Sequence, residues 1–121
     1  MEEGAELEMH KYIDNTFKSG ILKFVILNSV SRQSTYPYEL YKKLSKVNFG
    51  VLHDIQKSEV YNTLNSLEGK GLVKGESHLS GSKVQKEYKI TPKGMKVAVR
   101  SRKVMAKNIQ GIKKLIAYEF E

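Results

Sequence analysis

The sequence predicts a mainly helical α+β protein in which several helices precede a small β-hairpin and a long helix closes the chain. Three observations support this prediction. Apolar residues recur at three- and four-residue steps before residue 70, two short alternating segments flank a Ser-Gly-Ser turn, and Thr91-Pro92 opens a final helical segment. A chain of 121 residues is long enough for one compact domain and an extra helix, but too short for two independent cores.

Charge is distributed unevenly along the chain. The whole sequence has 21 Lys and Arg residues, 13 Asp and Glu residues and a net charge of +8, but residues 1–16 contain five of the acids and one base. The remainder therefore has 20 bases and 8 acids. This excess favours a polyanionic partner, such as nucleic acid or an acidic membrane surface, although a lysine-rich soluble surface is the simpler alternative.

Membrane segments and disulfides are not expected. The chain contains no cysteine, and its acidic N-terminus lacks the apolar region of a secretion signal. The most apolar stretch, residues 21–30, is too short to span a bilayer and contains Lys23 and Asn28. We therefore expect a soluble, cytoplasmic protein without a membrane partner.

The first half of the chain predicts an acidic N-terminal arm or helix at residues 1–18 and then two helices. Ser19 is the expected cap of the first helix, whose apolar face recurs at helical steps, and a polar loop is expected at residues 31–35. Pro37 fits the first turn of the second helix, which continues to about residue 46 with Leu40 and Leu44 on its buried side. The apolar residues of the first helix are Ile21, Leu22, Val25, Ile26 and Val30.

A connection at residues 47–57 leads to a third helix. Although the connection contains Asn48 and Gly50, it should pack against the domain, because it also contains Phe49, Val51, Leu52 and Ile55. Ser58 is the expected cap of the third helix, Val60, Leu64 and Leu67 are its buried stripe, and Gly69 and Gly71 should end it.

A β-hairpin is predicted at residues 72–79 and 83–90, around the turn Ser80-Gly81-Ser82. Val84, Tyr88 and Ile90 should share one face of its second strand, because side chains alternate between the two faces.

The final helix should have Thr91 as its cap and Pro92 at its first position, and should continue to about Phe120, with Gly111 weakening it locally. Met105, Ile109, Ile112 and Ile116 are spaced 4, 3 and 4 residues apart, the pattern of a helix that pairs with another helix. We expect these four residues and Phe120 to form a homodimer contact, since a helix of nearly 30 residues spans about 40 Å and exceeds a small core. Packing on its own domain is the alternative.

This order of elements is that of a winged helix-turn-helix followed by a long C-terminal dimerisation helix. The predicted units are residues 1–18, residues 19–91 as the DNA-binding domain and residues 92–121 as the dimerisation helix. In this fold the third helix enters a major groove, and the hairpin, called the wing, lies against an adjacent minor groove.

Polar side chains suited to DNA fall where this fold needs them. Asparagine can form paired hydrogen bonds with adenine, hydroxyl groups can reach phosphates, and lysines add charge attraction. Glu59 should point away from phosphate. The residues expected to bind DNA are Lys57, Ser58, Tyr61, Asn62, Asn65 and Ser66 on the third helix, Tyr36 and Tyr38 at the start of the second, and Lys74, His78, Ser80, Ser82 and Lys83 in the wing. A solvated surface is the alternative for these residues. Lys86 and Lys89 are expected to be ordinary strand lysines that protect the edges of the hairpin, and the basic residues of the last helix, which include Arg102, are expected to form its solvated face.

No enzymatic motif is present. The sequence lacks HExxH, GxSxG and GxxxxGK[ST], and its three histidines lie far apart. We expect neither catalysis nor a metal site nor a cofactor.

Three segments of the chain resemble the PadR family of winged-helix transcriptional regulators, and the resemblance covers about residues 19–97. The segments are PYELYKKL, SEVYNTLNSLEGKGLV and KEYKITPKG. The most specific part is the spacing of a serine, a tyrosine and a leucine-glutamate-x-x-glycine-leucine sequence, with Tyr88, Thr91 and Gly94 in support. The residues of that spacing are Ser58, Tyr61, Leu64, Leu67, Glu68, Gly71, Leu72 and Val73.

The resemblance implies a homodimer held by the C-terminal helix, which binds double-stranded DNA through the third helix and the wing. Two departures affect its specificity: Pro37 replaces a frequent glycine, and Glu59 and Asn62 stand where glycine and proline are frequent. The operator preference is therefore not carried over. Some members bind hydrophobic effectors between subunits, sometimes on a tryptophan, but this chain has no tryptophan and nothing in its sequence supports such a pocket.

The function that we expect is sequence-specific transcriptional regulation, by repression through a homodimer on a pseudo-palindromic operator. The two alternatives are a non-specific architectural DNA-binding protein and a winged-helix module that binds another protein.

Overall fold

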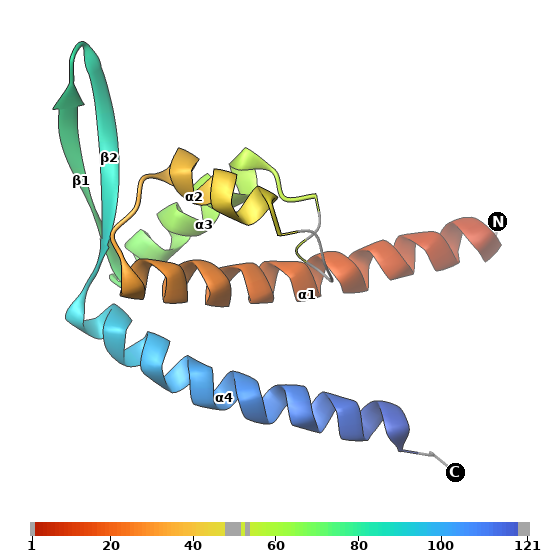
Figure 1. Cartoon of the computed structure of the whole chain (residues 1–121). Coiled ribbons are helices and arrows are strands. Elements are labelled where there is room, and N and C mark those ends of the chain that lie inside the picture. The colour runs from red at the N-terminus through yellow and green to blue at the C-terminus, as the bar shows by residue number, and fades with distance from the viewer. Residues whose placement is uncertain (1, 48–51, 53, 119–121) are drawn as a thin grey trace.

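The computed structural model describes residues 2–47, 52 and 54–118 of the chain. Its elements, in order, are the helices α1 (Glu2–Arg32), α2 (Pro37–Ser45) and α3 (Lys57–Gly69), the strands β1 (Val73–Ser80) and β2 (Lys83–Ile90), and the helix α4 (Pro92–Ala117). Figure 1 shows α2 and α3 on one side of α1, α4 on the other side, and the hairpin projecting beside the C-terminal end of α1. The predicted fold class is confirmed.

Helix α1 is continuous from the acidic N-terminus into the core, so the prediction that Ser19 caps a helix is wrong. The side chain of Lys18 contacts Asp54 and Glu59, which shows that α1 already packs against the α3 region before Ser19. Such tertiary contacts outweigh the weak local signal of one serine. The helix also continues through Ser31 to Arg32, which shortens the expected loop, and the expected boundary between residues 18 and 19 lies inside it.

The core lies between α1, α2, α3 and the base of the hairpin. Its fully buried side chains include Ile26 and Val30 of α1, Leu40 of α2, and Val60 and Leu64 of α3. Leu52 and Ile55 are also buried, so this part of the connection packs against the domain as predicted. The other two apolar residues of the connection, Phe49 and Val51, lie outside the described residues.

Helix α3 begins at Lys57 with Gln56 as its cap, so the prediction that Ser58 is the cap is wrong. The Glu59 carboxylate accepts a hydrogen bond from the backbone N–H of Gln56 (3.0 Å) and so satisfies a donor at the start of the helix. The predicted end is confirmed: α3 stops at Gly69, and Gly71 has a φ of 73°, a left-handed conformation that favours glycine.

The hairpin is antiparallel and pairs Val73 with Ile90 at its base and Ser80 with Lys83 at its outer end. The first strand starts and ends one residue later than expected, and the turn consists of Gly81 and Ser82 alone, with Gly81 at a φ of 65°. Tyr88 is buried, and its backbone N–H and C=O both bond with Thr35 (2.8 and 3.1 Å). This pairing fixes the base of the hairpin to the loop between α1 and α2.

The joint between β2 and α4 is closely packed. As predicted, Pro92 occupies the first turn, and the Thr91 hydroxyl accepts a hydrogen bond from the N–H of Gly94 (2.9 Å). The same hydroxyl donates to the carbonyl of Gly71 (2.7 Å). A Cβ on Gly94 would lie 1.9 Å from the Leu72 carbonyl oxygen, so this position requires glycine.

Helix α4 ends at Ala117, so it is shorter than expected; Phe120 lies outside the described residues. Arg102 is exposed, as expected for the solvated face of α4, but it also bonds to α1. Its guanidinium donates to the Asn28 side-chain oxygen and to the Ser31 hydroxyl (2.9 Å), both on α1. Since Asn28 is buried, this contact satisfies an acceptor that water reaches poorly.

Candidate nucleic-acid interface

One face of α3 is polar and exposed, and the opposite face is buried. Val60, Thr63, Leu64 and Leu67 face the core. The residues predicted to bind DNA lie on the other side: Lys57, Ser58, Tyr61, Asn62 and Asn65 are exposed, and Ser66 is half-buried. The structure therefore brings the expected third-helix residues together on one surface.

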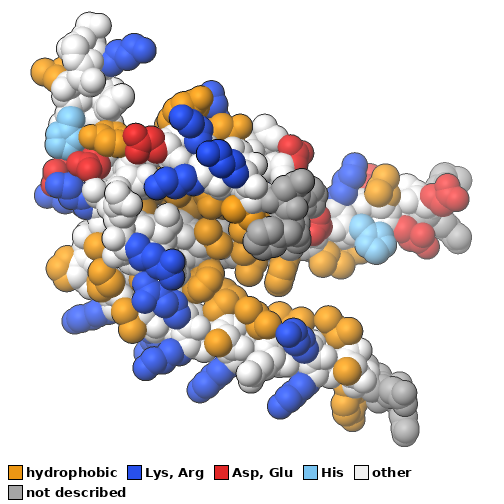
Figure 2. Space-filling model, viewed as in Figure 1, with side chains coloured by type: hydrophobic (Ala, Val, Ile, Leu, Met, Phe, Trp, Pro, Cys, Tyr) orange, Lys and Arg blue, Asp and Glu red, His pale blue; other side chains and the backbone are white. Residues whose placement is uncertain are grey.

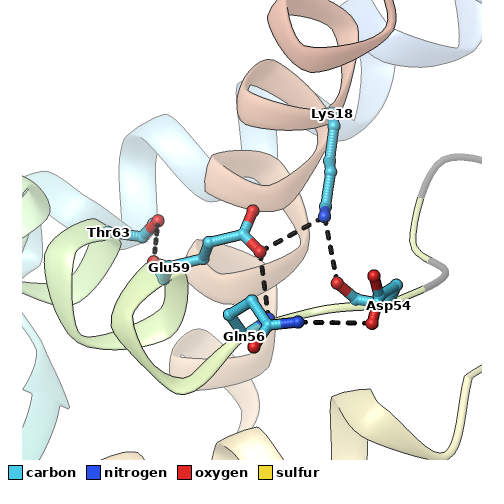
Figure 3. Close-up of polar contacts among 5 residues, drawn as sticks. All are labelled: Lys18, Asp54, Gln56, Glu59 and Thr63. Atoms are coloured by element: carbon cyan, nitrogen blue, oxygen red, sulfur yellow. Dashed lines mark hydrogen bonds and ion pairs between the residues drawn. The ribbon is translucent and has the colours of Figure 1, made fainter. Parts of the chain in front are cut away.

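The N-terminal end of α3 is held to α1 by the residues in Figure 3. Lys18 Nζ lies 3.2 Å from Glu59 Oε1 and donates to the backbone carbonyl of Asp54 (3.3 Å). This N-terminal anchor, Lys18–Glu59, turns the only carboxylate in the first turn of α3 toward α1. Sequence reasoning missed Lys18, because the sequence around a lysine on a weakly patterned helix does not indicate which distant residue the lysine contacts.

The C-terminal end of α3 is held to the hairpin by Glu68. Its carboxylate accepts hydrogen bonds from the backbone N–H of Gly75 and from Lys86 Nζ, both at 2.8 Å. The hydrogen bond from Lys86, and then that from Gly75, lower the pKa of Glu68 below its ordinary value, and the bond to Glu68 raises the pKa of Lys86. A Cβ on Gly75 would lie 2.1 Å from Lys86 Cε, so glycine leaves room for this C-terminal anchor, Glu68–Gly75–Lys86.

Asn65 is also joined to the hairpin. The Tyr88 hydroxyl donates to Asn65 Oδ1 (3.1 Å), so the acceptor that paired bonding to adenine needs already has a partner, while the amide N–H₂ group remains a donor. Of the two asparagines, Asn62 is therefore better suited to read a base with both of its polar atoms.

Aromatic residues from two helices meet beside the hairpin. A groove of about 300 Å³ is lined by Tyr36, the N-cap of α2, Tyr38 of α2, Tyr61 of α3, and Val84 and Lys86 of β2, among others. Lys57 Nζ lies 5.0 Å from the centre of the Tyr38 ring. The structure thus places the expected residues Tyr36 and Tyr38 next to those of α3, with hydroxyl groups and cations around one groove.

The predicted wing residues separate into two groups. Ser80, Ser82 and Lys83 are exposed at the outer end, where Figure 2 shows hydrophobic and basic side chains. Lys74 lies near the base, opposite Lys89, and His78 lies 3.0 Å from Glu87 Oε1. A hydrogen bond from Ser34 is the main cause of the lowered pKa of Glu87, and His78 adds to it. The outer end is therefore better suited than Lys74 or His78 to contact DNA.

Apolar side chains remain exposed on α4 and on the N-terminal part of α1. Met105 is half-buried, while Ile109, Ile112 and Ile116 are 48%, 41% and 80% exposed. Five residues of α1 that sequence reasoning did not assign to this surface are also exposed: Leu7, Met9, Tyr12, Ile13 and Phe17. A groove of about 530 Å³ separates the two helices and is lined by Phe17, Ile21, Met105, Ile112 and Leu115, among others.

Within residues 2–47, 52 and 54–118, no group of three His, Asp or Glu residues is placed to hold a metal ion. No helix of the described part is long and apolar enough to cross a membrane.

Comparisons with known proteins agree with this geometry. The family model described as "Transcriptional regulator PadR-like family" matches residues 26–100. The chain is similar to a crystal structure of a PadR family transcriptional regulator from Eggerthella lenta, with 24% identity over 95% of this chain and 98% of that one and a TM-score of 0.76.

Two further crystal structures are similar to this chain. A PadR-like transcriptional regulator from Bacillus cereus has 26% identity over 83% of this chain and 95% of its own, with a TM-score of 0.66. A PadR family transcription regulator from Clostridium difficile has 19% identity over 79% and 94%, with a TM-score of 0.59. A comparison with curated proteins found no match.

Proposed function

The chain belongs to the PadR-like family of transcriptional regulators, and from this premise we propose that it is a homodimeric repressor that binds a pseudo-palindromic operator in double-stranded DNA. The family implies regulation through DNA binding. Residues 19–91 form the DNA-binding unit of this proposal, and residues 92–121 the dimerisation unit. The protein then acts in the cytoplasm, on the nucleoid.

The observation that carries the proposal is the exposed polar face of α3. Its side chains are amides, hydroxyls and one lysine, so entry into a major groove buries no carboxylate next to phosphate. The N-terminal and C-terminal anchors hold this face at both ends of the helix. A base-reading residue on a rigid, supported helix keeps its geometry, which specific binding requires.

Side chains suited to phosphate contacts lie around this face. Lys57 and the hydroxyl groups of Tyr36, Tyr38 and Tyr61 lie beside the groove between the helices and the hairpin. Lys83 and the backbone of the turn lie at the outer end of the hairpin. When α3 occupies a major groove, a sugar-phosphate backbone separates that major groove from the next minor groove. The side chains beside the protein groove and those at the outer end of the hairpin are both suited to contact this backbone.

The homodimer of the proposal uses the exposed apolar residues of α4 together with those of α1. The two surfaces also have opposite charges: Glu3, Glu6 and Glu8 lie on α1, while Lys107, Lys113 and Lys114 lie on α4. A two-fold arrangement that places α1 of one protomer against α4 of the other buries apolar area and pairs these charges. Occupancy of the operator by such a dimer would block transcription.

The test is DNA binding measured by fluorescence anisotropy, with a labelled duplex from the DNA upstream of the protein's own gene and a scrambled duplex, at two salt concentrations. We expect preference for the native duplex that persists at the higher salt. Asn62→Ala should reduce this preference by about 1–3 kcal/mol, and more than Asn65→Ala does. Folded variants of both asparagines with unchanged specific affinity would contradict the proposal.

The excess of bases favours a second candidate, a non-specific architectural protein. Equal and steeply salt-dependent binding to both duplexes would support this candidate. Absence of binding at either salt would instead support a protein-interaction module.

A further inference from the structure

Two apolar side chains lie opposite each other near the outer end of the hairpin. Leu79 pairs with Val84 across the two strands, one step before the pair that flanks the turn. Leu79 is 80% exposed and Val84 is 68% exposed, so neither is part of the core. Strand alternation puts both on the same face as Lys86 and Tyr88.

This face of the hairpin looks toward α3. Lys86 bonds to Glu68, Tyr88 bonds to Asn65, and Val84 lines the groove with Tyr61 of α3. The apolar pair is therefore continuous with the surface that the proposed function assigns to DNA. If one sugar-phosphate backbone of the duplex lies in this protein groove, Leu79 and Val84 lie on the minor-groove side of that backbone.

The charges around the pair match DNA. Residues 77–86 contain two lysines, one histidine and no acid. The neighbouring acids of the two strands, Glu76 and Glu87, are paired with Lys89 and His78 (3.2 and 3.0 Å). Glu68 of α3 is paired with Lys86 (2.8 Å), which leaves Lys83 as the lysine nearest the apolar pair that is not engaged by Glu68. An exposed apolar pair beside Lys83, in a segment whose own residues include no acid, fits the minor groove, whose walls are apolar sugars and whose edges are phosphates.

We propose that Leu79 and Val84 enter the minor groove together and contact its sugars and base edges, adding affinity that does not come from counterion release. This inference rests on the proposed function. The contact displaces water from apolar surface but neutralises no phosphate, so its contribution is insensitive to salt. Lys83, whose charge attracts phosphates, differs from the pair in this respect.

The first experiment compares the double variant Leu79→Thr/Val84→Thr with Lys83→Ala on the upstream duplex over a range of salt concentrations. Threonine keeps the strand preference of the hairpin. We expect the double variant to bind about tenfold more weakly at every salt, which leaves the slope of log affinity against log salt unchanged. Lys83→Ala should reduce that slope by about one. Thermal unfolding of each variant checks that the fold is kept.

The second experiment uses the same duplex with 2,6-diaminopurine in place of adenine, which adds an amino group in the minor groove and leaves the major-groove edge intact. The wild type should lose affinity on the substituted duplex, and the double variant should lose much less. Equal affinities of wild type and double variant on the normal duplex, or equal losses on the substituted one, would overturn the inference. A reduced salt slope in the double variant would also overturn it.

These outcomes are separable from failure of the proposed function. If the double variant binds like the wild type while Asn62→Ala abolishes the preference for the native duplex, the minor-groove contact is wrong and the regulator remains. If the wild type binds neither duplex at either salt, both are wrong.

Discussion

The carboxylate of Glu68 connects α3, which carries the proposed DNA-binding face, to the hairpin. One oxygen accepts from the Gly75 backbone and the other from Lys86. The side chain is about one-third exposed, so water and salt weaken the ion pair, and its larger role is to set the position of the hairpin relative to α3.

Replacing Glu68 with Gln should change how stability depends on pH. Because the folded pKa of Glu68 is lowered, its contribution is present above its ordinary value of 4.5 and is lost as the pH falls through the folded pKa. Glu68→Gln should thus lower the free energy of unfolding at pH 7, and the difference from wild type should shrink below pH 4.5. Urea unfolding at several pH values measures both. A difference that stays constant across this range would contradict the assignment.

The helices are held to one another by a few polar contacts in addition to the core. α3 is fixed by the N-terminal and C-terminal anchors, and α4 is fixed to α1 through Arg102. The contact from Arg102 differs from a surface ion pair, because its acceptor Asn28 is buried and also donates to the Phe24 carbonyl (2.8 Å). All polar atoms of the Asn28 amide thus take part in ordering α1 and α4.

Arg102→Ala should destabilise the protein by about 1–3 kcal/mol, because it leaves a buried acceptor without its donor. Arg102→Lys, the matched control, should recover part of this loss, since one ammonium group cannot reproduce the fork of a guanidinium. The free energy of unfolding in urea gives both values. A loss below about 0.5 kcal/mol for Arg102→Ala would show that water replaces the arginine.

At the same scale, the sequence predicts the kinds and order of elements better than their ends. Apolar spacing, Thr91-Pro92 and Gly71 mark real features, because these signals are local. Ser19 and Ser58 mislead, since serine caps a helix only if no tertiary contact or better cap extends it. Glu59 makes Gln56 the cap of α3, and packing through Lys18 continues α1 past Ser19.

In the candidate site, the sequence predicts which residues share a helix face but not which distant residues they contact. The exposed face of α3 follows from helical geometry, so the predicted residues lie together on it. The partners of Lys18, Glu68, Asn65 and Arg102 are far away in sequence, and no spacing rule identifies them. The sequence also does not predict that the N-terminal part of α1 is exposed, because this exposure depends on how far the core extends along that helix.

The whole molecule has two exposed surfaces with different chemistry. The exposed face of α3 is mainly polar and the hairpin beside it has mixed side chains, including the apolar pair Leu79 and Val84, while α4 and the N-terminal part of α1 expose rows of apolar residues (Figure 2). An exposed apolar surface of this extent is typical of a protein interface. In the proposed dimer, one surface binds DNA and the other binds the second protomer.

Ile112→Glu should shift the protein from dimer to monomer, because it places a carboxylate in the apolar stripe of α4. Gln110→Glu, the matched control, adds the same charge on the opposite side of the helix and should leave the dimer intact. Sedimentation equilibrium measures the association constant, and we expect a reduction of at least about 100-fold for Ile112→Glu alone. Equal association of the two variants would show that the stripe packs elsewhere.

The close joint at Thr91 and Gly94 has a consequence for the length of the operator. Strand β2 enters α4 through Gly94, which is packed against the Leu72 carbonyl oxygen, so there is no hinge between the proposed DNA-binding unit and the proposed dimerisation helix. The distance and the angular phase between the two reading heads of a dimer are then set by α4. Adding about half a helical turn between half-sites moves one of them to the far side of the duplex, where a molecule without a hinge cannot follow it.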